Sequence, residues 1–215
     1  MIDATDFTIP DTGVLRNKLG ITDSAALLKA TTDSTVLRLA ELHASPIRGG
    51  FDSAHLQDIH HHLYQDLYDW AGELRSIEAH NVPASQVEKS LNSVLDRLSR
   101  ENHLKGLSAE EWAGSASAYL YDLGTIQPFL AGNEVALQEF AVELARKNNL
   151  GLHWDATHDI ASGSMALLCQ AEQSANLRRL IMLAMDTDPI VQPSNNGHRI
   201  ERSMEPFQEI GNLRL

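Results

Sequence analysis

The chain is predicted to fold as an all-α helical bundle with at most a small residual β-hairpin. Three observations predict this class. Apolar residues recur at spacings of three and four in one segment after another, which is the period of an amphipathic helix. These segments begin at residues that cap helices and end at Gly or Pro. Only the short stretch 73–83, ELRSIEAHNVP, has the composition of a connector or a weak strand pair.

The first predicted helix covers residues 21–42. Ser45 followed by Pro46 ends it, because the residue before a proline disfavours helical backbone. One face of this helix is apolar and is expected to pack on the core. That face consists of Leu28, Thr32, Val36, Leu39 and Leu42.

The second predicted helix lies within residues 51–72. Asp52 is expected to cap its start, since a carboxylate can accept hydrogen bonds from the first free amides, and Gly72 follows its end. Its apolar face is also expected to be buried. That face consists of Leu56, Ile59, Leu63, Leu67 and Trp70.

Two capping boxes mark the next two helices. Ser85 with Glu88, and Ser108 with Glu111, have the spacing at which both side chains bond to backbone amides at a helix start. Each box precedes an apolar stripe. The stripes are Val87, Leu91, Val94, Leu95 and Leu98 in the first helix, and Trp112, Tyr119, Leu123 and Ile126 in the second.

A loop then interrupts the helical pattern at QPFLAGNEV, residues 127–135. Pro128 and Gly132 break the helix, and Asn133 is expected to cap the following one, so the loop lies on a helix N-terminus. The apolar stripe of that helix is Leu137, Phe140, Ala141 and Leu144.

The chain is expected to form one domain over residues 1–185. Its last part contains one or two further helices within residues 164–186. The C-terminal tail, residues 186–215, turns polar and holds Pro189, Pro193 and a Ser-Asn-Asn-Gly cluster, so we expect it to be irregular.

Composition excludes several classes of function. With 215 residues and 43% hydrophobic content the chain can bury one sizeable core. Its formal net charge of -12 repels phosphate backbones, so nucleic acid is not an expected partner. No apolar run is long enough to span a membrane. The single Cys169 excludes an internal disulfide and fits a reducing compartment, so we expect a cytoplasmic protein.

The blocks of this sequence follow one another as they do in the Fic family, which the chain resembles over Val14 to Met185. The blocks are VLRNKLGI, FDSAHLQDIHHHLYQDLYDWAGELRSI, ENHLKGLSAEEWA and IQPFLAGNEVALQEF. The resemblance implies a helical fold and transfer of AMP. It also implies a signature loop of the form H-x-F-x-(D/E)-G-N-(G/K)-R. In that loop the His deprotonates the target hydroxyl, the acidic residue holds magnesium, and the glycines, the helix start and the Arg bind phosphates.

This chain departs from the signature at its chemical positions. Gln127 stands in place of the His, Ala131 in place of the acidic residue, Glu134 in place of the second Gly and Val135 in place of the Arg. Further on, Gln138 stands where many members have a second Arg. The positions that match are Pro128, Phe129, Gly132 and Asn133.

Each departure removes a chemical role. The carboxamide of Gln127 does not titrate near neutrality and so cannot act as a general base. Ala131 has no oxygen for a hard cation, and Val135 offers no charge to a polyphosphate. Glu134 places a carboxylate where phosphate binds in the family. We therefore expect no cofactor and no metal at this loop.

The flap that clamps targets in the family also looks truncated. Only residues 78–81 separate Arg75-Ser76-Ile77 from Val82-Pro83, and this short connection includes His80. A self-inhibitory S/T-x-x-x-E-(G/N) helix motif is also missing.

Three functional interpretations follow. The favoured one is a Fic-fold pseudoenzyme that serves as a binding or regulatory module, with a protein partner or a small molecule in a cleft formed by residues 127–129 and 132–134. The alternative is an enzyme with different chemistry in the same cleft, with Glu134, His80 or Gln127 as its catalytic group. A residual nucleotidyl transferase is the third. Pro128 and Phe129 are expected to pack and shape the loop, while Gly132 and Asn133 could retain an anion-binding role.

The histidines in the second helix are not expected to bind metal, because no two of them have the i, i+4 spacing that puts two ligands on one face. His60 lies on the apolar stripe, and His55, His61 and His62 are expected at the surface.

Overall fold

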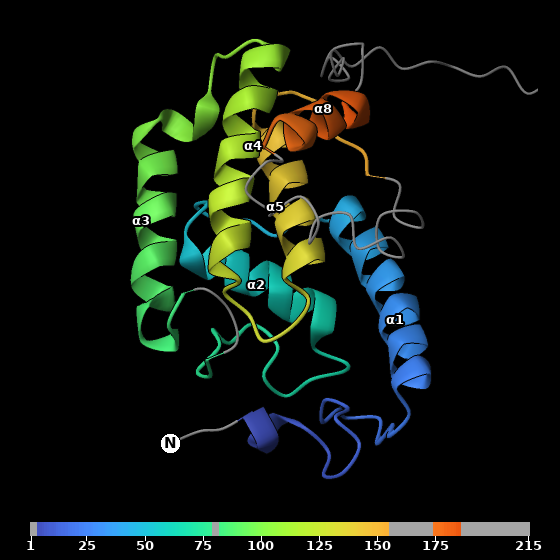
Figure 1. Cartoon of the computed structure of the whole chain (residues 1–215). Helices are drawn as coiled ribbons and strands as arrows, with labels where there is room; N and C mark the ends of the chain where they lie inside the picture. The colour runs from blue at the N-terminus through green and yellow to red at the C-terminus, as the bar shows by residue number, and fades with distance from the viewer. Residues whose placement is uncertain (1–3, 79–81, 155–173, 186–215) are drawn as a thin grey trace, which may run out of the picture.

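A computed structural model describes residues 4–78, 82–154 and 174–185 (Figure 1). The apolar periodicity of the sequence becomes a set of α-helices joined by loops and short 3-10 turns. The 3-10 turns are η1 (Ala4–Phe7), η2 (Ala84–Gln86) and η3 (Asn102–Leu104). The α-helices are α1 (Ser24–Ala44), α2 (Ser53–Tyr64), α3 (Val87–Arg100), α4 (Ala109–Ile126), α5 (Asn133–Lys147) and α8 (Ser174–Ala184).

The helices pack around α5. In Figure 1, α3, α4 and α5 stand side by side, α2 crosses beneath them and α1 leans against the other side of the bundle. α8 lies across the ends of α4 and α5 that are remote from the signature loop. Every residue of α5 from Val135 to Ala145 is buried, so this helix is the centre of the core.

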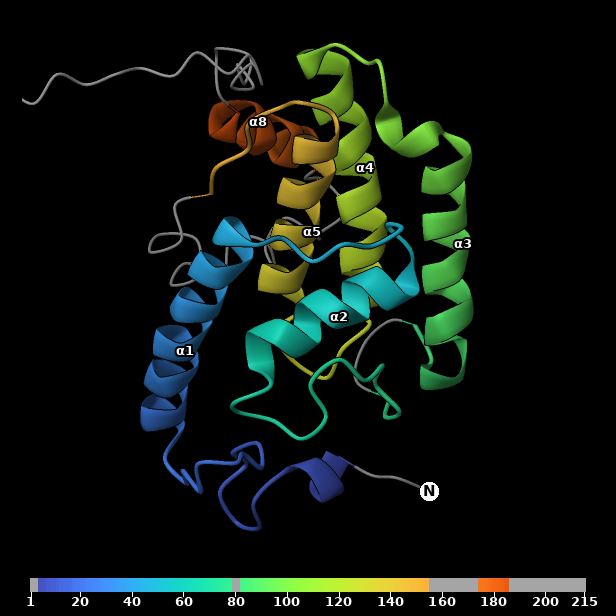
Figure 2. The ribbon, with the colours of Figure 1, turned by 180° about the vertical axis from the view of Figure 1, so that it is seen from behind.

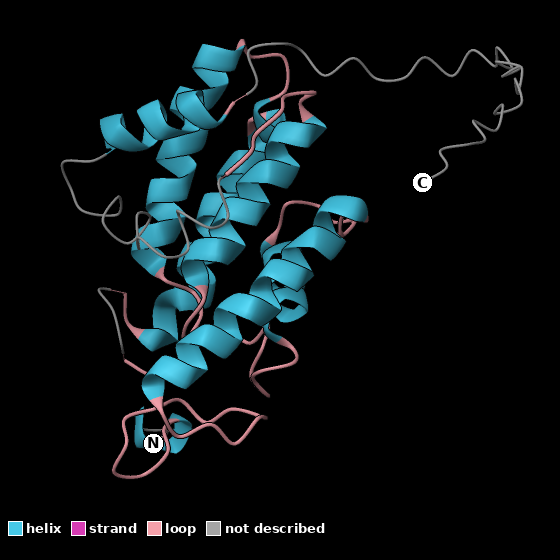
Figure 3. Cartoon of the chain, turned by 90° about the vertical axis from the view of Figure 1, so that its right-hand side faces the viewer, coloured by secondary structure: helices cyan, strands magenta, loops and turns pink. Residues whose placement is uncertain are grey.

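The all-α prediction is confirmed. Among the described residues the only β-pairing consists of two isolated bridges, Thr8 with Leu15 and Leu152 with Met185, and Figure 3 shows no strand. The described residues 73–78 and 82–83 form a connector. Residues 79–81, which include His80, and the predicted tail 186–215 lie outside the described residues, as does Cys169.

Four of the predicted apolar stripes, those of α2, α3, α4 and α5, are buried as expected, except that Val94 in α3 is half-buried. In α2 and its exit this holds for Leu56, Ile59, Leu63, Leu67 and Trp70. In α3 and α4 it holds for Val87, Leu91, Leu95, Leu98, Trp112, Tyr119, Leu123 and Ile126. Asp52 caps α2 by accepting from the backbone amide of His55 at 2.9 Å.

The predicted stripe of α1 is confirmed at its C-terminal end, where Leu42 is buried and Leu39 packs against the core, and is wrong by one residue before that. Leu28 is 67% exposed and Val36 is 39% exposed, whereas Leu27 and Thr35 are buried. Apolar residues occur on both sides of this helix, so the 3.6-residue period allows two orientations. Contact with α2 selects one of them, and a local pattern does not contain that contact.

Two predicted caps are also wrong. At Ser85 the chain forms the turn η2, so α3 begins at Val87 after Gln86, and no side chain caps it. At the start of α5 the capping position is taken by Gly132, and Asn133 is already the first helical residue. The box of Ser108 with Glu111 at the start of α4 is present as predicted.

The difference between the two Ser–Glu pairs predicts different effects of the same mutation. Ser108→Ala should lower the free energy of unfolding by about 1 kcal/mol, because it removes a cap that accepts from the Glu111 amide. Ser85→Ala is the matched control and should change stability by less than about 0.5 kcal/mol. Urea unfolding of both variants measures this, and equal effects would contradict the assignment of the caps.

Candidate functional site

The signature loop connects α4 to α5 at the base of the bundle in Figure 1. Two residues with left-handed backbone produce its sharp turns. Gln127, which ends α4, has φ 49° and ψ 67°, and Gly132, which precedes α5, has φ 75° and ψ 11°. The loop therefore lies at the N-terminus of α5, as predicted from the sequence. It holds the residues proposed to form a cleft, Gln127, Pro128, Phe129, Gly132, Asn133 and Glu134.

Asn133 closes the loop on itself instead of capping the helix. Its Oδ1 accepts from the Phe129 amide at 2.8 Å, and its Nδ2 donates to the Phe129 carbonyl at 2.9 Å. Both the oxygen and the nitrogen of this buried side chain are thus bonded to the backbone of Phe129. An Asn at this position fixes the width of the loop, which is a structural role.

Phe129 anchors the loop in the core. Its side chain is fully buried, and its ring stacks on that of His60 with a centroid distance of 3.8 Å. The packing role expected of Phe129 is therefore confirmed, and so is the place of His60 on the buried side of α2.

His60 connects the loop to α2 and is held neutral. Its Nδ1 accepts from the Gly72 amide at 2.9 Å, so Nε2 carries the proton and donates to the Ala131 carbonyl at 2.9 Å. Burial lowers the pKa of His60 to about 4, although the bond to the Ala131 carbonyl favours the charged form. The ring therefore acts as a rigid bridge between loop and helix.

Gly132 is required by both backbone and space. A Cβ at this position would lie 2.4 Å from the ring of Tyr64, which is itself buried in α2. The positive φ also favours glycine. Burial raises the pKa of Tyr64, and nearby negative charge at Tyr68 and Glu134 raises it further.

Arg75 holds the loop from the flap side. Its backbone amide donates to the Pro128 carbonyl at 2.9 Å, and its Nε donates to the Gln127 carbonyl at 2.7 Å. The other guanidinium nitrogens donate to the carbonyls of Ile126, Ile77 and Val82. Arg75 is buried, and desolvation lowers its pKa. The sequence resemblance marked this residue only as the edge of the flap and gave no hint of its role as a clamp.

The side chains at the chemical positions of the loop do not point to transfer chemistry. The Nε2 of Gln127 donates to the Gly124 carbonyl at 2.7 Å. Val135 is 7% exposed and borders a small cavity together with Leu39 and Val142. The Ala131 carbonyl accepts the hydrogen bond from Nε2 of His60. Glu134, in the first turn of α5, is half-buried and close enough to Tyr64 to influence its pKa.

Two buried glutamates on α5 were missed by the sequence analysis. Glu139 is 1% exposed and its Oε2 lies 2.9 Å from Nε2 of His43, while Glu143 is 5% exposed and its Oε2 lies 2.8 Å from Nε2 of His55. His55 was expected at the surface and is buried, which is a further correction. The partners are far apart in sequence, so no local spacing could have indicated them. Burial raises the pKa of Glu139, against the opposing effect of His43.

Comparison with known proteins places the chain in a family. The model of the Fic/DOC family matches residues 50–142. The probable protein adenylyltransferase Fic of Salmonella typhimurium is 31% identical over 69% of this chain and 76% of its own length. The chain belongs to the Fic family.

Other relatives agree with this assignment. The protein adenylyltransferase VbhT of Bartonella schoenbuchensis is 36% identical over 69% of this chain, which spans only 32% of that protein. Among solved structures, the BepC protein of Bartonella tribocorum with bound AMPPNP has a TM-score of 0.75 and 24% identity, covering 85% of this chain and 97% of that one. This last likeness shows the shared fold.

The environment of His60 predicts a specific pH dependence of stability. The unfolded chain takes up a proton at His60 near pH 6.5, and the folded chain does so only near pH 4. Stability from this residue is therefore complete above pH 6.5 and is lost as the pH falls to about 4, by about 3 kcal/mol.

The variant His60→Asn should lose this part of the pH dependence, and His61→Asn, a change at the exposed neighbour, should keep it. Urea unfolding of the wild type and both variants between pH 7 and pH 4 gives the three slopes. Equal slopes for the wild type and His60→Asn would show that His60 is not held neutral.

Proposed function

We propose that this chain is a Fic-fold pseudoenzyme that does not transfer AMP and serves as a binding or regulatory module. The observation that carries the proposal is Gln127. It occupies the position of the family's catalytic His, its carboxamide has no titratable proton near neutrality, and it donates to the Gly124 carbonyl within its own helix. The adenylyl transfer named for the relatives is the activity that the chain has lost on this proposal.

The positions for metal and phosphate support the same conclusion. Ala131 offers a carbonyl that already accepts from His60, and carbonyl oxygen alone is a poor substitute for the carboxylate that holds magnesium. Val135 is buried and offers no charge where the family has a phosphate-binding Arg. The guanidinium of Arg75, which lies beside the loop, is bonded to backbone carbonyls.

Glu134 adds a repulsive element to the anion site. Gly132 provides no side-chain cap, so the first amides of α5 face the loop and would attract an anion. A carboxylate in that first turn interacts favourably with the helix dipole and repels a second negative group. On this proposal, the carboxylate of Glu134 weakens phosphate binding at this helix start.

On this proposal the module works in the cytoplasm and engages a protein partner or a small molecule at the loop. Within the described residues no helix is long and apolar enough to cross a membrane. A loop that is held rigidly by His60, Asn133 and Arg75 suits recognition, because little order has to be gained on binding.

The first consequence is that the purified protein should not transfer AMP from ATP to itself or to protein targets, and that Gln127→His alone should not restore transfer. The single change returns a base but no metal ligand and no phosphate ligand. Labelled AMP that stays on the protein after denaturation is the readout. Incorporation by the wild type would contradict the proposal. Incorporation by Gln127→His alone would show that the metal and phosphate ligands missing at Ala131 and Val135 are not needed for transfer.

The second consequence is weak binding of magnesium-ATP, with a dissociation constant near 1 mM or weaker. One charge-assisted phosphate contact contributes about 1.5 to 3 kcal/mol, so absence of the Arg weakens binding about tenfold to a hundredfold. Repulsion by Glu134 adds about 1 to 4 kcal/mol.

Calorimetric titration measures this affinity, and Glu134→Gln should strengthen it about tenfold by removing the charge while keeping the size. The matched control is Glu110→Gln, which removes a carboxylate from the first turn of α4 and should leave the affinity unchanged. A wild-type dissociation constant of about ten micromolar or tighter would mean that the loop does bind nucleotide.

A further inference from the structure

A cavity of about 320 Å³ lies between the connection from α1 to α2 and the C-terminal half of α5. Figure 2 shows this connection crossing the face of α5 on its way to α2. Three cationic side chains border the cavity, Arg48 from the connection and Arg146 and Lys147 from the last turn of α5. Phe51, His55 and Glu143 complete its wall and floor.

The floor of the cavity is built from buried polar groups. His55 is 2% exposed, and its Nδ1 accepts from the Phe51 amide at 3.3 Å, so Nε2 carries the proton toward Glu143 at 2.8 Å. The backbone at Gly49 lies against this ring, and a Cβ there would lie 2.2 Å from it. Among the described residues that line the cavity, Glu143 is the only carboxylate, and it is already engaged by His55.

The two cations in the last turn of α5 do not bond to the free carbonyls at the end of that helix. Cations in the last turn of a helix commonly bond to its free carbonyls. In α5 those of Leu144, Ala145 and Arg146 accept from Asn148, Asn149 and Leu150.

Within the part of the chain that the structure describes, the side chains of Arg48, Arg146 and Lys147 form no ion pair and no hydrogen bond. The charge of Arg146 is nevertheless close enough to Glu139 to oppose the rise in the pKa of that carboxyl. Lys147 only lies over the ring of Phe51, with Nζ 4.9 Å from its centroid.

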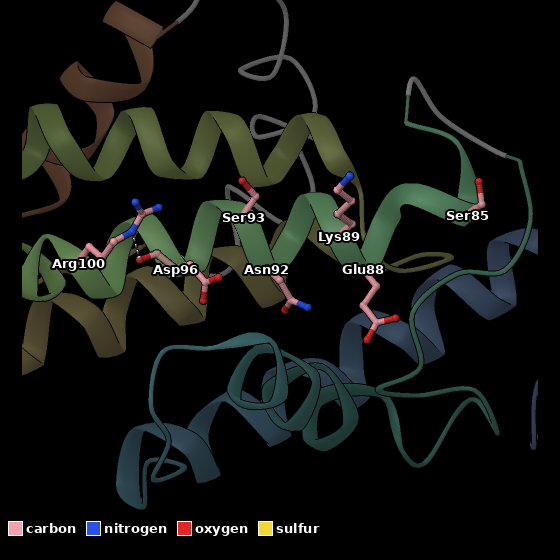
Figure 4. Close-up of a pocket in the computed structure, with 7 residues that line it drawn as sticks. All are labelled: Ser85, Glu88, Lys89, Asn92, Ser93, Asp96 and Arg100. Atoms are coloured by element: carbon pink, nitrogen blue, oxygen red, sulfur yellow. Dashed lines mark hydrogen bonds between the residues drawn. The ribbon is translucent and has the colours of Figure 1, made fainter.

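The cavity on the outer face of α3 has a different balance of charges from the cavity at α5. Figure 4 shows a larger cavity there, of about 570 Å³, whose Lys89 and Arg100 are balanced by Glu88 and Asp96. The cavity at α5 has three cations against one carboxylate, in a chain whose net charge is -12. An excess of positive charge at one place in an acidic protein indicates a site that attracts anions.

We propose that this cavity binds a small phosphorylated ligand through its phosphate group. A phosphate monoester carries a charge of about −1.5 to −2 at pH 7 and has three acceptor oxygens, so it can bond to all three cations. A carboxylate ligand would need only a single guanidinium. A second cavity of about 220 Å³ shares Arg146 and is bordered by Val142, Leu150 and Leu152. This neighbouring apolar surface accommodates the organic part of the ligand.

The site is distinct from the signature loop. Glu143 follows Asn133 by ten residues in α5, which separates the two places by about 15 Å along the helix axis. The proposal uses none of residues 127–135, so it holds or fails independently of the proposed loss of AMP transfer.

Backbone NMR of the whole chain during titration with inorganic phosphate tests the proposal. The amide signals of Arg48, Gly49 and Gly50 and of Arg146 and Lys147 should shift and saturate, and those of Gly132 to Val135 should not. Phenyl phosphate should bind more tightly than inorganic phosphate, because the neighbouring apolar surface can cover its ring. Equal affinity for the two would leave the phosphate site in place and overturn the assignment of the neighbouring surface.

The double variant Arg48→Gln, Arg146→Gln should weaken phosphate binding about a hundredfold, which is the loss expected for two charge-assisted contacts. The matched control is Lys89→Gln, Arg100→Gln on the outer face of α3, which removes the same charge and should leave affinity unchanged. Equal losses in the two double variants, or shifts spread over all basic residues, would show that phosphate responds to net charge alone and would overturn the proposal.

Discussion

The burial of α5 is the constraint on which the rest of the structure depends. A helix that touches neighbours on every side has no solvent face for its polar residues, so each of them needs a partner inside the protein. Glu139 and Glu143 find theirs in His43 and His55, which come from the end of α1 and from the start of α2. Placing α5 in the centre therefore also determines where these neighbouring segments must lie.

The same constraint shapes the signature loop. Because α5 begins inside the core, the chain that enters it must satisfy its own backbone groups within a few residues. The Asn133 side chain donates to the Phe129 carbonyl, and His60 donates to the Ala131 carbonyl. Arg75 donates to the carbonyls of Ile126 and Gln127. The residues that match the family signature, Phe129, Gly132 and Asn133 among them, are the ones that build this frame. Of the residues that differ from it, Gln127 and Ala131 contribute to the frame through their backbone carbonyls.

Sequence reasoning predicted the fold class and the buried faces of α2, α3 and α4, because each of these helices has apolar residues on a single side. It failed for α1, where Leu27 and Leu28 compete, and the contact with α2 decides between them. It also failed for His55, whose partner Glu143 lies on another helix. Local periodicity contains no information about such distant pairs.

At the candidate site the sequence located every residue of the loop but misjudged what Asn133 does there. An Asn before a helical pattern usually predicts an N-cap. Here Gly132, with its left-handed backbone, is the N-cap residue, and Asn133 is the first residue of the helix.

Arg75 holds the loop in its shape through hydrogen bonds to backbone carbonyls. A buried guanidinium has five N–H groups to satisfy, and here four of its hydrogen bonds go to carbonyls of the loop and the flap. A phosphate that claimed this charge would leave those carbonyls without donors in a buried place, at a cost of about 1 to 3 kcal/mol for each. The guanidinium of Arg75 is thus held by the backbone that it organises, through four hydrogen bonds that also stabilise the loop.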